Sequence, residues 1–356
     1  MATDADPDHE AALAAEIRKC RVFVLGAGFS AAAGVPLTVE LLSEALQLFA
    51  AECPGIYARV EGYAREAMGA ASEALDIANL SFSELCTFLE FIELREYGGG
   101  ERWSENGSRE KLALRYYLAK TLVSRTPRPA AVPEPYRAFA AQLHPRDMVI
   151  SFNWDGLLEA SLEAVGKKYV YDRSDDSAVT ISKLHGSVNW RLGEPNVWGE
   201  PQRTLPWAQL NFGSGMMARH FAARPLLDLA VWQNYRPLGE VDPYLVLPGY
   251  GKAFDVRANA ALWYKPEFIF AATHHVYIIG LSLAHDDFFV RSFFLSNLPY
   301  IYSYSGVPGR RIVIINPAPS AKVDYAFILQ QDNVELWNEP FNIAHVGLFA
   351  ANECQA

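Results

Sequence analysis

Three side chains suited to an active site follow two segments whose composition is typical of strands. Asn153 and Asp155 follow residues 148–152, and His185 follows residues 179–184. A neutral imidazole can act as a general base near neutral pH. Among the eight histidines, His185 alone is placed in this way among the predicted elements. The alternative is a core histidine that bonds a backbone carbonyl.

A glycine-rich turn follows the first apolar segment. Residues 22–25 are apolar, residues 26–28 are Gly-Ala-Gly, and helix-compatible residues begin at about Ser30. A strand that runs through glycines into a helix N-terminus is typical of phosphate binding, because bare backbone N–H groups and the helix dipole face the turn. The alternative is a purely structural role for these glycines. Glycines also occupy turns that are simply tight, and Gly34 comes too late for the Gly-x-Gly-x-x-Gly spacing.

Two further apolar segments end in small or polar residues. Residues 276–279 lead into Gly280 and Ser282, and residues 311–315 lead into Asn316. In an open α/β sheet, ligands bind outside the carboxyl ends of the strands, so we expect all these groups to meet at one crevice. The alternative is local: each Asn or Asp caps a helix, and Ser282 is a turn residue.

Between the apolar segments lie helical patterns, which predict an α/β fold: a Rossmann-like parallel sheet with helices on both faces. A mostly helical insertion separates the first strand from the second. We therefore divide the chain into a Rossmann-like domain, residues 1–36 and 148–356 with a variable insertion at 187–275, and a helical module, residues 37–147.

Helix signals are clear within this helical module. Thr38 is expected to cap a helix, and Ser81 and Glu84 have the spacing of a capping box. The predicted buried face of the first helix consists of Val39, Leu42, Leu46 and Phe49.

Composition excludes several classes of protein. The chain has 356 residues, of which 51% are hydrophobic, and a net charge of −10 that opposes binding to nucleic acid or to an anionic membrane. It has four cysteines without a Cys-x-x-Cys pair, no apolar run of membrane-spanning length and no signal peptide, so we expect a cytoplasmic protein. Residues 285–287, His-Asp-Asp, fit a helix cap better than a metal site, and we expect no metal.

Taken in order, these motifs resemble those of the sirtuins. More closely, the chain is similar to the bacterial sirtuin-like proteins of phage defence, over about residues 20–340. The matching segments are Gly26-Ala-Gly-x-Ser30-x-x-x-Gly34-x-Pro36, Ser151-Phe-Asn-Trp-Asp155, Lys183-Leu-His-Gly-Ser-Val-Asn-Trp190, Pro248-Gly-Tyr-Gly-Lys252, Trp263, Gly280-Leu-Ser-Leu283 and Asn316.

The resemblance implies NAD as the bound substrate and a role for each motif residue. Asn153 would face the nicotinamide ribose, Asp155 the carboxamide, and His185 would be the catalytic base. The resemblance also implies that Ala27, Gly28 and Ser30 face the pyrophosphate and that Ser282 and Asn316 line the adenosine end, with Gly26 and Gly280 as further contacts of the dinucleotide.

One departure from the deacylating sirtuins bears on the reaction. Those enzymes carry a four-cysteine zinc module after the His-Gly element, whereas no cysteine lies between Cys86 and Cys354 here. The resemblance therefore implies an NAD+ hydrolase that acts as an anti-phage defence effector and depletes NAD when activated. We expect a homo-oligomer or a hexameric translocase-type ATPase as partner, and neither nucleic acid nor membrane. The alternatives are a protein deacylase or ADP-ribosyltransferase, and a non-catalytic sensor of NAD or ADP-ribose.

Overall fold

The structure is a computed structural model, and it describes residues 20–68, 81–95, 109–171, 175–192, 221–223, 243–249, 252, 260–284, 287–296, 310–329 and 334–349. Most of the predicted variable insertion, together with His285, Asp286 and Cys354, lies outside these residues.

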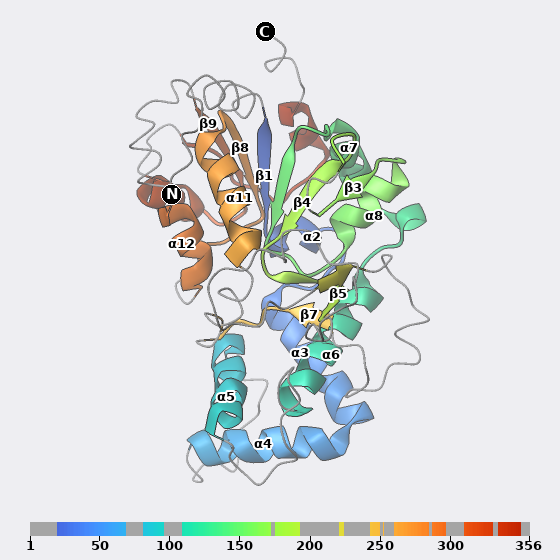
Figure 1. The fold of residues 1–356 in the computed structure, drawn as a ribbon, viewed down its shortest axis with the longest axis vertical. Helices are drawn as coiled ribbons and strands as arrows, with labels where there is room; N and C mark the ends of the chain where they lie inside the picture. Colours follow the sequence, from blue (N-terminus) through green and yellow to red (C-terminus); the bar gives the residue numbers. More distant parts are fainter. Residues whose placement is uncertain are drawn as a thin grey trace, which may run out of the picture.

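Seven parallel strands form the main sheet, in the order β10-β9-β8-β1-β2-β4-β3 (Figure 1). Without the two-residue edge strand β3, this is the order of doubly wound dinucleotide-binding folds. Successive connections run outward from β1 in opposite directions, so the topological switch point lies between β1 and β8. The strands are β1 (Arg21–Leu25), β2 (Met148–Ser151), β3 (Tyr169–Val170), β4 (Val179–Lys183), β8 (His275–Ile279), β9 (Arg311–Ile315) and β10 (Val334–Trp337).

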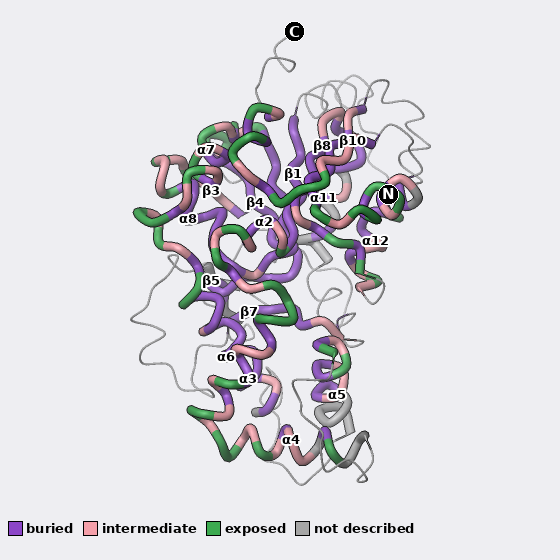
Figure 2. Tube along the Cα trace, turned by 180° about the vertical axis from the view of Figure 1, so that it is seen from behind, coloured by how far each residue is buried: buried purple, intermediate pink, exposed green. Residues whose placement is uncertain are grey.

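Burial follows from the composition of these strands. All residues of β1, β2 and β4 are buried, and so are the last four of β8 and β9 (Figure 2). Strands that are mainly apolar and buried along their whole length have no face for solvent, so helices must cover both faces of the sheet. The predicted α/β fold is confirmed.

Helices pack on both faces of the sheet. On one face, Phe23 of β1 contacts Phe139 of α7 (Glu134–Gln142) and Phe349 of η5 (Ile343–Phe349). On the other face, Phe270 of α11 packs on α12, and Tyr325 of α14 packs on Phe294 of α12. Right-handed crossovers on the two sides of β1 place the two groups on opposite faces. The helices of the second group are α11 (Ala260–Ala272), α12 (Phe288–Ser296) and α14 (Ala321–Leu329), and α8 (Leu157–Ala164) packs beside α7.

A second core lies among the helices of the insertion, in the lower half of Figure 1. These helices are α3 (Thr38–Glu52), α4 (Pro54–Met68), α5 (Phe82–Arg95) and α6 (Arg109–Arg125). Helix α7, which the sequence division grouped with them, contributes instead to the core of the main sheet.

A small three-stranded sheet, in the order β6-β5-β7, lies between the two cores. Its strands are β5 (Gly186–Leu192), β6 (Phe221–Ala223) and β7 (Pro243–Leu245). Tyr244 and Leu245 are successive residues of β7 and point to opposite faces, so Tyr244 joins the core of the main sheet and Leu245 the helical core. In β5, whose pairing with β7 shifts register between Ser187 and Arg191, Val188 joins the helical core and Trp190 the core of the main sheet. The two cores are therefore joined through this sheet.

The details of α3 correct two expectations. Leu37 rather than Thr38 occupies the N-cap, and its N–H donates to Glu40 Oε2 over 3.1 Å. Val39 is 81% exposed, because the buried stripe runs through Leu41, Leu42, Ala45, Leu46 and Phe49. The capping box of α5 is confirmed: the Glu84 N–H donates to Ser81 Oγ, and the Ser81 N–H donates to Glu84 Oε2.

Candidate active site

A cavity of about 500 Å³ opens at the carboxyl ends of the central strands. The register of the sheet brings the strand ends to one level. Leu25 of β1 pairs with Ser151 of β2 on one side and with Ile279 of β8 on the other. Ser151 in turn pairs with Lys183 of β4, and Ile279 with Ile315 of β9. The predicted residues that line the cavity are Gly26, Ala27, Gly28, Asn153, Asp155, His185, Gly280, Ser282 and Asn316. Ser30 does not line the cavity, but it holds two residues that do. The expected convergence of the strand ends is therefore observed.

The glycines of the first turn have a structural cause. The Gly26 N–H donates to the Ile279 carbonyl over 3.0 Å, and the Gly28 N–H donates to the Gly280 carbonyl over 2.8 Å. A Cβ on Gly28 would lie 2.9 Å from the Gly280 backbone. Gly280 has a φ of +63°, and a Cβ there would meet Phe29 N far inside van der Waals distance. Close approach of the turns after β1 and β8 thus accounts for these glycines, independently of any phosphate.

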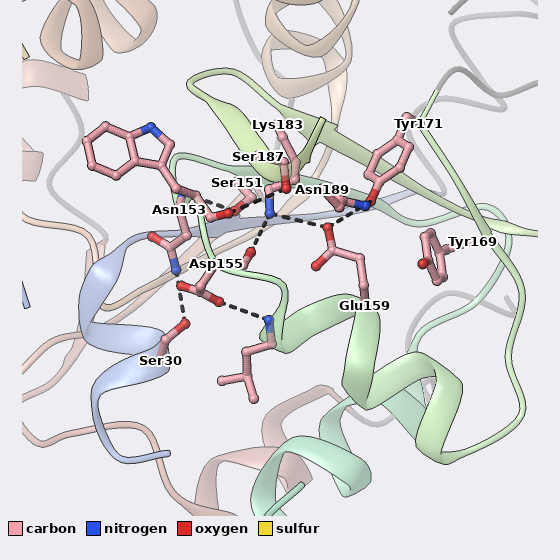
Figure 3. A network of polar contacts seen from close by, with 12 residues as sticks. Ser30, Ser151, Asn153, Asp155, Glu159, Tyr169, Tyr171, Lys183, Ser187 and Asn189 are labelled. Atoms are coloured by element: carbon pink, nitrogen blue, oxygen red, sulfur yellow. Dashed lines mark hydrogen bonds and ion pairs between the residues drawn. The ribbon is translucent and has the colours of Figure 1, made fainter. Parts of the chain in front are cut away.

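Asn153 and Asp155 are held through Ser30 (Figure 3). The Asn153 Nδ2 group donates to the Gly26 carbonyl over 2.9 Å and to Ser30 Oγ over 3.3 Å. The Ser30 hydroxyl also bonds the Asp155 carboxylate, which accepts a further 3.0 Å bond from the Leu157 N–H at the start of α8. Both amide hydrogens of Asn153 are therefore used within the protein, and its oxygen remains available to a donor in the cavity.

A buried polar network lies behind Asp155 (Figure 3). The Lys183 ammonium donates to the Asp155 carbonyl and pairs with Glu159 Oε1 at 3.2 Å. The Tyr171 hydroxyl donates to the same Glu159 oxygen over 3.0 Å, and Asn189 Nδ2 donates to that hydroxyl over 2.9 Å. Burial raises the pKa of the Asp155 carboxyl, and the charge of Lys183 opposes this shift.

His185 is buried beside the cavity, in contact with the rings of Phe152 and Trp263. One ring nitrogen hydrogen-bonds the backbone of Phe152, while Nε2 is buried without a partner among the described residues. Burial, followed by the charge of Lys252, lowers the pKa of His185 to about 3. The imidazole is therefore neutral near pH 7, and Nε2 offers a lone pair.

The turn after His185 is sterically fixed. Gly186 has a φ of +78°, and a Cβ there would overlap the Tyr244 carbonyl oxygen. The Val246 N–H donates to the His185 carbonyl over 2.9 Å. Strand β7 thus holds the His-Gly turn against the cavity.

An ion pair that was not among the predicted site residues also lines the cavity. The Lys252 ammonium donates to both carboxylate oxygens of Asp287, over 2.8 and 3.0 Å. Asp287 Oδ1 also accepts from the Val290 N–H, so the predicted helix cap is present. Lys252 is the only cationic side chain among the described residues that line the cavity. In the sequence, Lys252 belongs to the motif of residues 248–252 and Asp287 to the predicted helix cap. Their pairing was not predicted, because the two positions lie 35 residues apart.

Asn316 and Ser282 differ in whether their side chains are already hydrogen-bonded within the described part of the protein. Asn316 Nδ2 donates to the Leu281 carbonyl, and its oxygen accepts from the Ala318 N–H, both over 2.9 Å. This side chain ties two loops together and does not cap α14, which begins at Ala321. Ser282 is exposed at the cavity.

The helical module forms one wall of the cavity, which was also not predicted. This wall is apolar and includes Leu37, Val39, Leu41, Phe82 and Leu122. The module reaches the loop before Lys252 as well, because a Cβ on Gly249 would lie 2.8 Å from Glu90 Oε2 of α5.

The described residues contain neither a candidate metal site nor a helix that could span a membrane. Among them, no group of three or more His, Cys, Asp or Glu side chains has the geometry of a metal site. None of the helices in the described ranges is long and apolar enough to cross a membrane.

Comparison with known proteins finds similarity in solved structures only. No family model and no curated protein matches the chain. A sirtuin structure from work on sirtuin substrate affinity has a TM-score of 0.43 and 13% identity, covering 97% of this chain and 98% of its own. A mutant Sir2 homologue bound to 2'-O-acetyl ADP ribose has a TM-score of 0.38 and 14% identity, covering 97% and 95%. Values this low carry no functional argument, so the fold assignment rests on strand order and register.

Proposed function

We propose that the chain binds NAD+ in this cavity and hydrolyses the bond between nicotinamide and ribose, giving nicotinamide and ADP-ribose. The observation that carries the proposal is the meeting of Asn153 and His185 at one cavity, beside the glycine turn of β1. The strand order supports a dinucleotide, and the motifs shared with sirtuin-like defence proteins support NAD+ in particular.

Cleavage of the bond between nicotinamide and ribose requires few catalytic groups. In NAD+ the nicotinamide ring carries a positive charge and departs as a neutral molecule, so its departure needs no general acid. The reaction needs a stabilised oxocarbenium-like transition state and a positioned water. The free amide oxygen of Asn153 suits the positioning of a ribose hydroxyl or of that water, and His185 Nε2 suits the removal of a proton from either.

We further propose that the chain is an anti-phage defence effector whose activity is gated, because unrestrained hydrolysis would exhaust cellular NAD. Self-association or a hexameric translocase-type ATPase would act through the helical module. The contact of Glu90 with the Gly249 loop supports this route, since it joins that module to the wall of the cavity.

The test is nicotinamide release by the purified full-length chain, measured by chromatography with and without phage-infected lysate. We expect His185→Ala and Asn153→Ala each to lower turnover about 100-fold or more while circular dichroism stays unchanged. His144→Ala is the control, because His144 is exposed at the opposite end of β2. Equal turnover by all four chains would contradict the proposal.

The same assay separates the alternatives. Nicotinamide release that depends on an added acyl-lysine or acceptor peptide would indicate a deacylase or ADP-ribosyltransferase. Binding of NAD+ or ADP-ribose without release under any condition would indicate a sensor.

A further inference from the structure

Lys183 is a charged side chain in an unusual place. It is the last residue of β4, two positions before His185, and its side chain is 1% exposed. A buried ammonium requires partners that replace water. Lys183 has two: the carbonyl oxygen of Asp155, which lies in the loop after β2, and the carboxylate of Glu159 on α8.

The loop after β2 depends on this contact. It carries Asn153 and Asp155, and it is fixed by few other backbone bonds, among them those of the Phe152 N–H to Leu25 and of the Val188 N–H to the Trp154 carbonyl. A charged donor in a buried site makes a stronger hydrogen bond than a neutral one. Lys183 therefore anchors the backbone of Asp155 from the side away from the cavity.

Charge in this cluster is unbalanced. Lys183 and Glu159 pair with each other, and Asp155, which lines the cavity, forms no ion pair with any described cationic side chain. The described groups that act on this carboxylate are Ser30 of α2 (Ala27–Ala31), Leu157 and Glu159 of α8, Lys183 of β4 and the Tyr136 ring of α7, and Lys183 is the one cation among them.

We propose that Lys183, held by Glu159, is a positioning residue that fixes the Asn153–Asp155 loop and keeps Asp155 as a carboxylate for a positively charged ring in the cavity. The inference rests on the proposed function only in naming that ring as the nicotinamide of NAD+. An ionised Asp155 attracts the cationic ring and does not attract the neutral product, nicotinamide. Lys183 thus favours substrate over product through Asp155.

The experiment removes both charges of the pair from the full-length chain. Lys183→Met with Glu159→Gln keeps the volumes of the side chains and leaves neither charge unpaired. Carboxyl ¹³C NMR follows the titration of Asp155, whose signal is identified by its loss in Asp155→Asn. Calorimetry compares the affinities for NAD+ and for ADP-ribose, which lacks the cationic ring.

We expect the titration midpoint of Asp155 to rise by about one pH unit or more in the double variant, and the ratio of NAD+ affinity to ADP-ribose affinity to fall about tenfold. Glu159→Gln alone should move the midpoint in the opposite direction, since it removes a negative neighbour and keeps the ammonium. This variant serves as well if the double variant does not fold. The control, Arg21→Met with Asp147→Asn, removes a buried pair at the other end of the sheet and should change neither quantity.

An unchanged midpoint and an unchanged affinity ratio in both Glu159 variants would overturn the proposal. A wild-type chain that binds both ligands without cleaving NAD+ would overturn the proposed hydrolysis alone, because the affinity ratio still measures the effect of Lys183. A wild-type chain that binds neither NAD+ nor ADP-ribose would overturn the proposal that Asp155 attracts the nicotinamide ring. The titration of Asp155 would then decide whether Lys183 keeps this side chain ionised.

Discussion

The backbone N–H of Gly28 donates a 2.8 Å hydrogen bond to the carbonyl oxygen of Gly280. This bond joins the turn after β1 to the turn after β8, at the point where the strand order reverses. Ligands of doubly wound sheets bind above this point. The distance between the two turns, and hence the base of the cavity, is set by two residues that have no side chain.

Gly280→Ala should therefore destabilise the protein strongly. The added methyl group would meet Phe29 N, and the positive φ of 63° adds conformational strain, for a total loss of about 3 kcal/mol in the free energy of unfolding. Gly166→Ala is the matched control, because its φ is +69° and nothing lies within 4 Å of an added Cβ. Urea titration should show a loss of about 1 kcal/mol for that control. Equal losses would mean that the contact is unimportant.

His185 should make stability depend on pH. Burial, and then Lys252, lower the pKa of His185 to about 3, so between about pH 6.5 and 3 the unfolded chain binds a proton that the folded chain does not. The free energy of unfolding should fall as the pH is lowered through this window, by up to about 1.4 kcal/mol per pH unit from this group. His185→Gln should show a shallower fall in urea titrations at pH 7, 5.5 and 4.5. Burial also lowers the pKa of His345, but this residue is present in both chains, so its contribution to the pH dependence cancels in the comparison. Parallel curves would contradict the prediction.

Lys252→Met should shift the acid limb of the pH–activity profile to higher pH. Without the ammonium, Asp287 remains beside His185 and raises the pKa of the imidazole. We expect the acid limb of the kcat/KM profile for nicotinamide release to shift upward by about one pH unit, while Lys252→Arg keeps the wild-type profile. An unchanged limb in Lys252→Met would show that the ion pair has no electrostatic effect on His185.

Ser30→Ala should separate activity from folding. The substitution removes the hydroxyl that bonds both Asn153 and Asp155, so we expect kcat for nicotinamide release to fall about tenfold and the free energy of unfolding to fall by about 1–2 kcal/mol. Ser161→Ala provides the control: this buried serine donates to the Leu157 carbonyl and does not line the cavity. Its stability loss should be similar, with kcat unchanged. A similar loss of kcat in both variants would attribute the effect to general destabilisation.

Local patterns were sufficient to predict the sheet and the residues at its edge. The run before Asn153 is mainly apolar, and the run before His185 is rich in β-branched residues; both compositions favour strands, and parallel strands bring their carboxyl ends together. The meeting of Asn153 and His185 at one cavity follows from that geometry alone.

The remaining features depend on contacts between distant segments. Lys252 and Asp287 carry no mark of their pairing in the sequence, and Lys183 is a charge inside a segment that otherwise indicates a strand. For α3, apolar spacing could not distinguish Val39 from Leu41, because the direction in which the helix packs is set by α6 and not by α3 itself. The contact between Gly28 and Gly280 likewise joins turns that are distant in the sequence, so the pattern Gly-Ala-Gly could not predict it.

The apolar wall that α3, α5 and α6 contribute to the cavity has a consequence for evolution. Exchange of the helical insertion for another would replace part of the cavity wall along with the outer surface. A new insertion would also lose the contact of Glu90 with the Gly249 loop. A change in the module that altered binding of the proposed partner would therefore also alter the lining of the cavity.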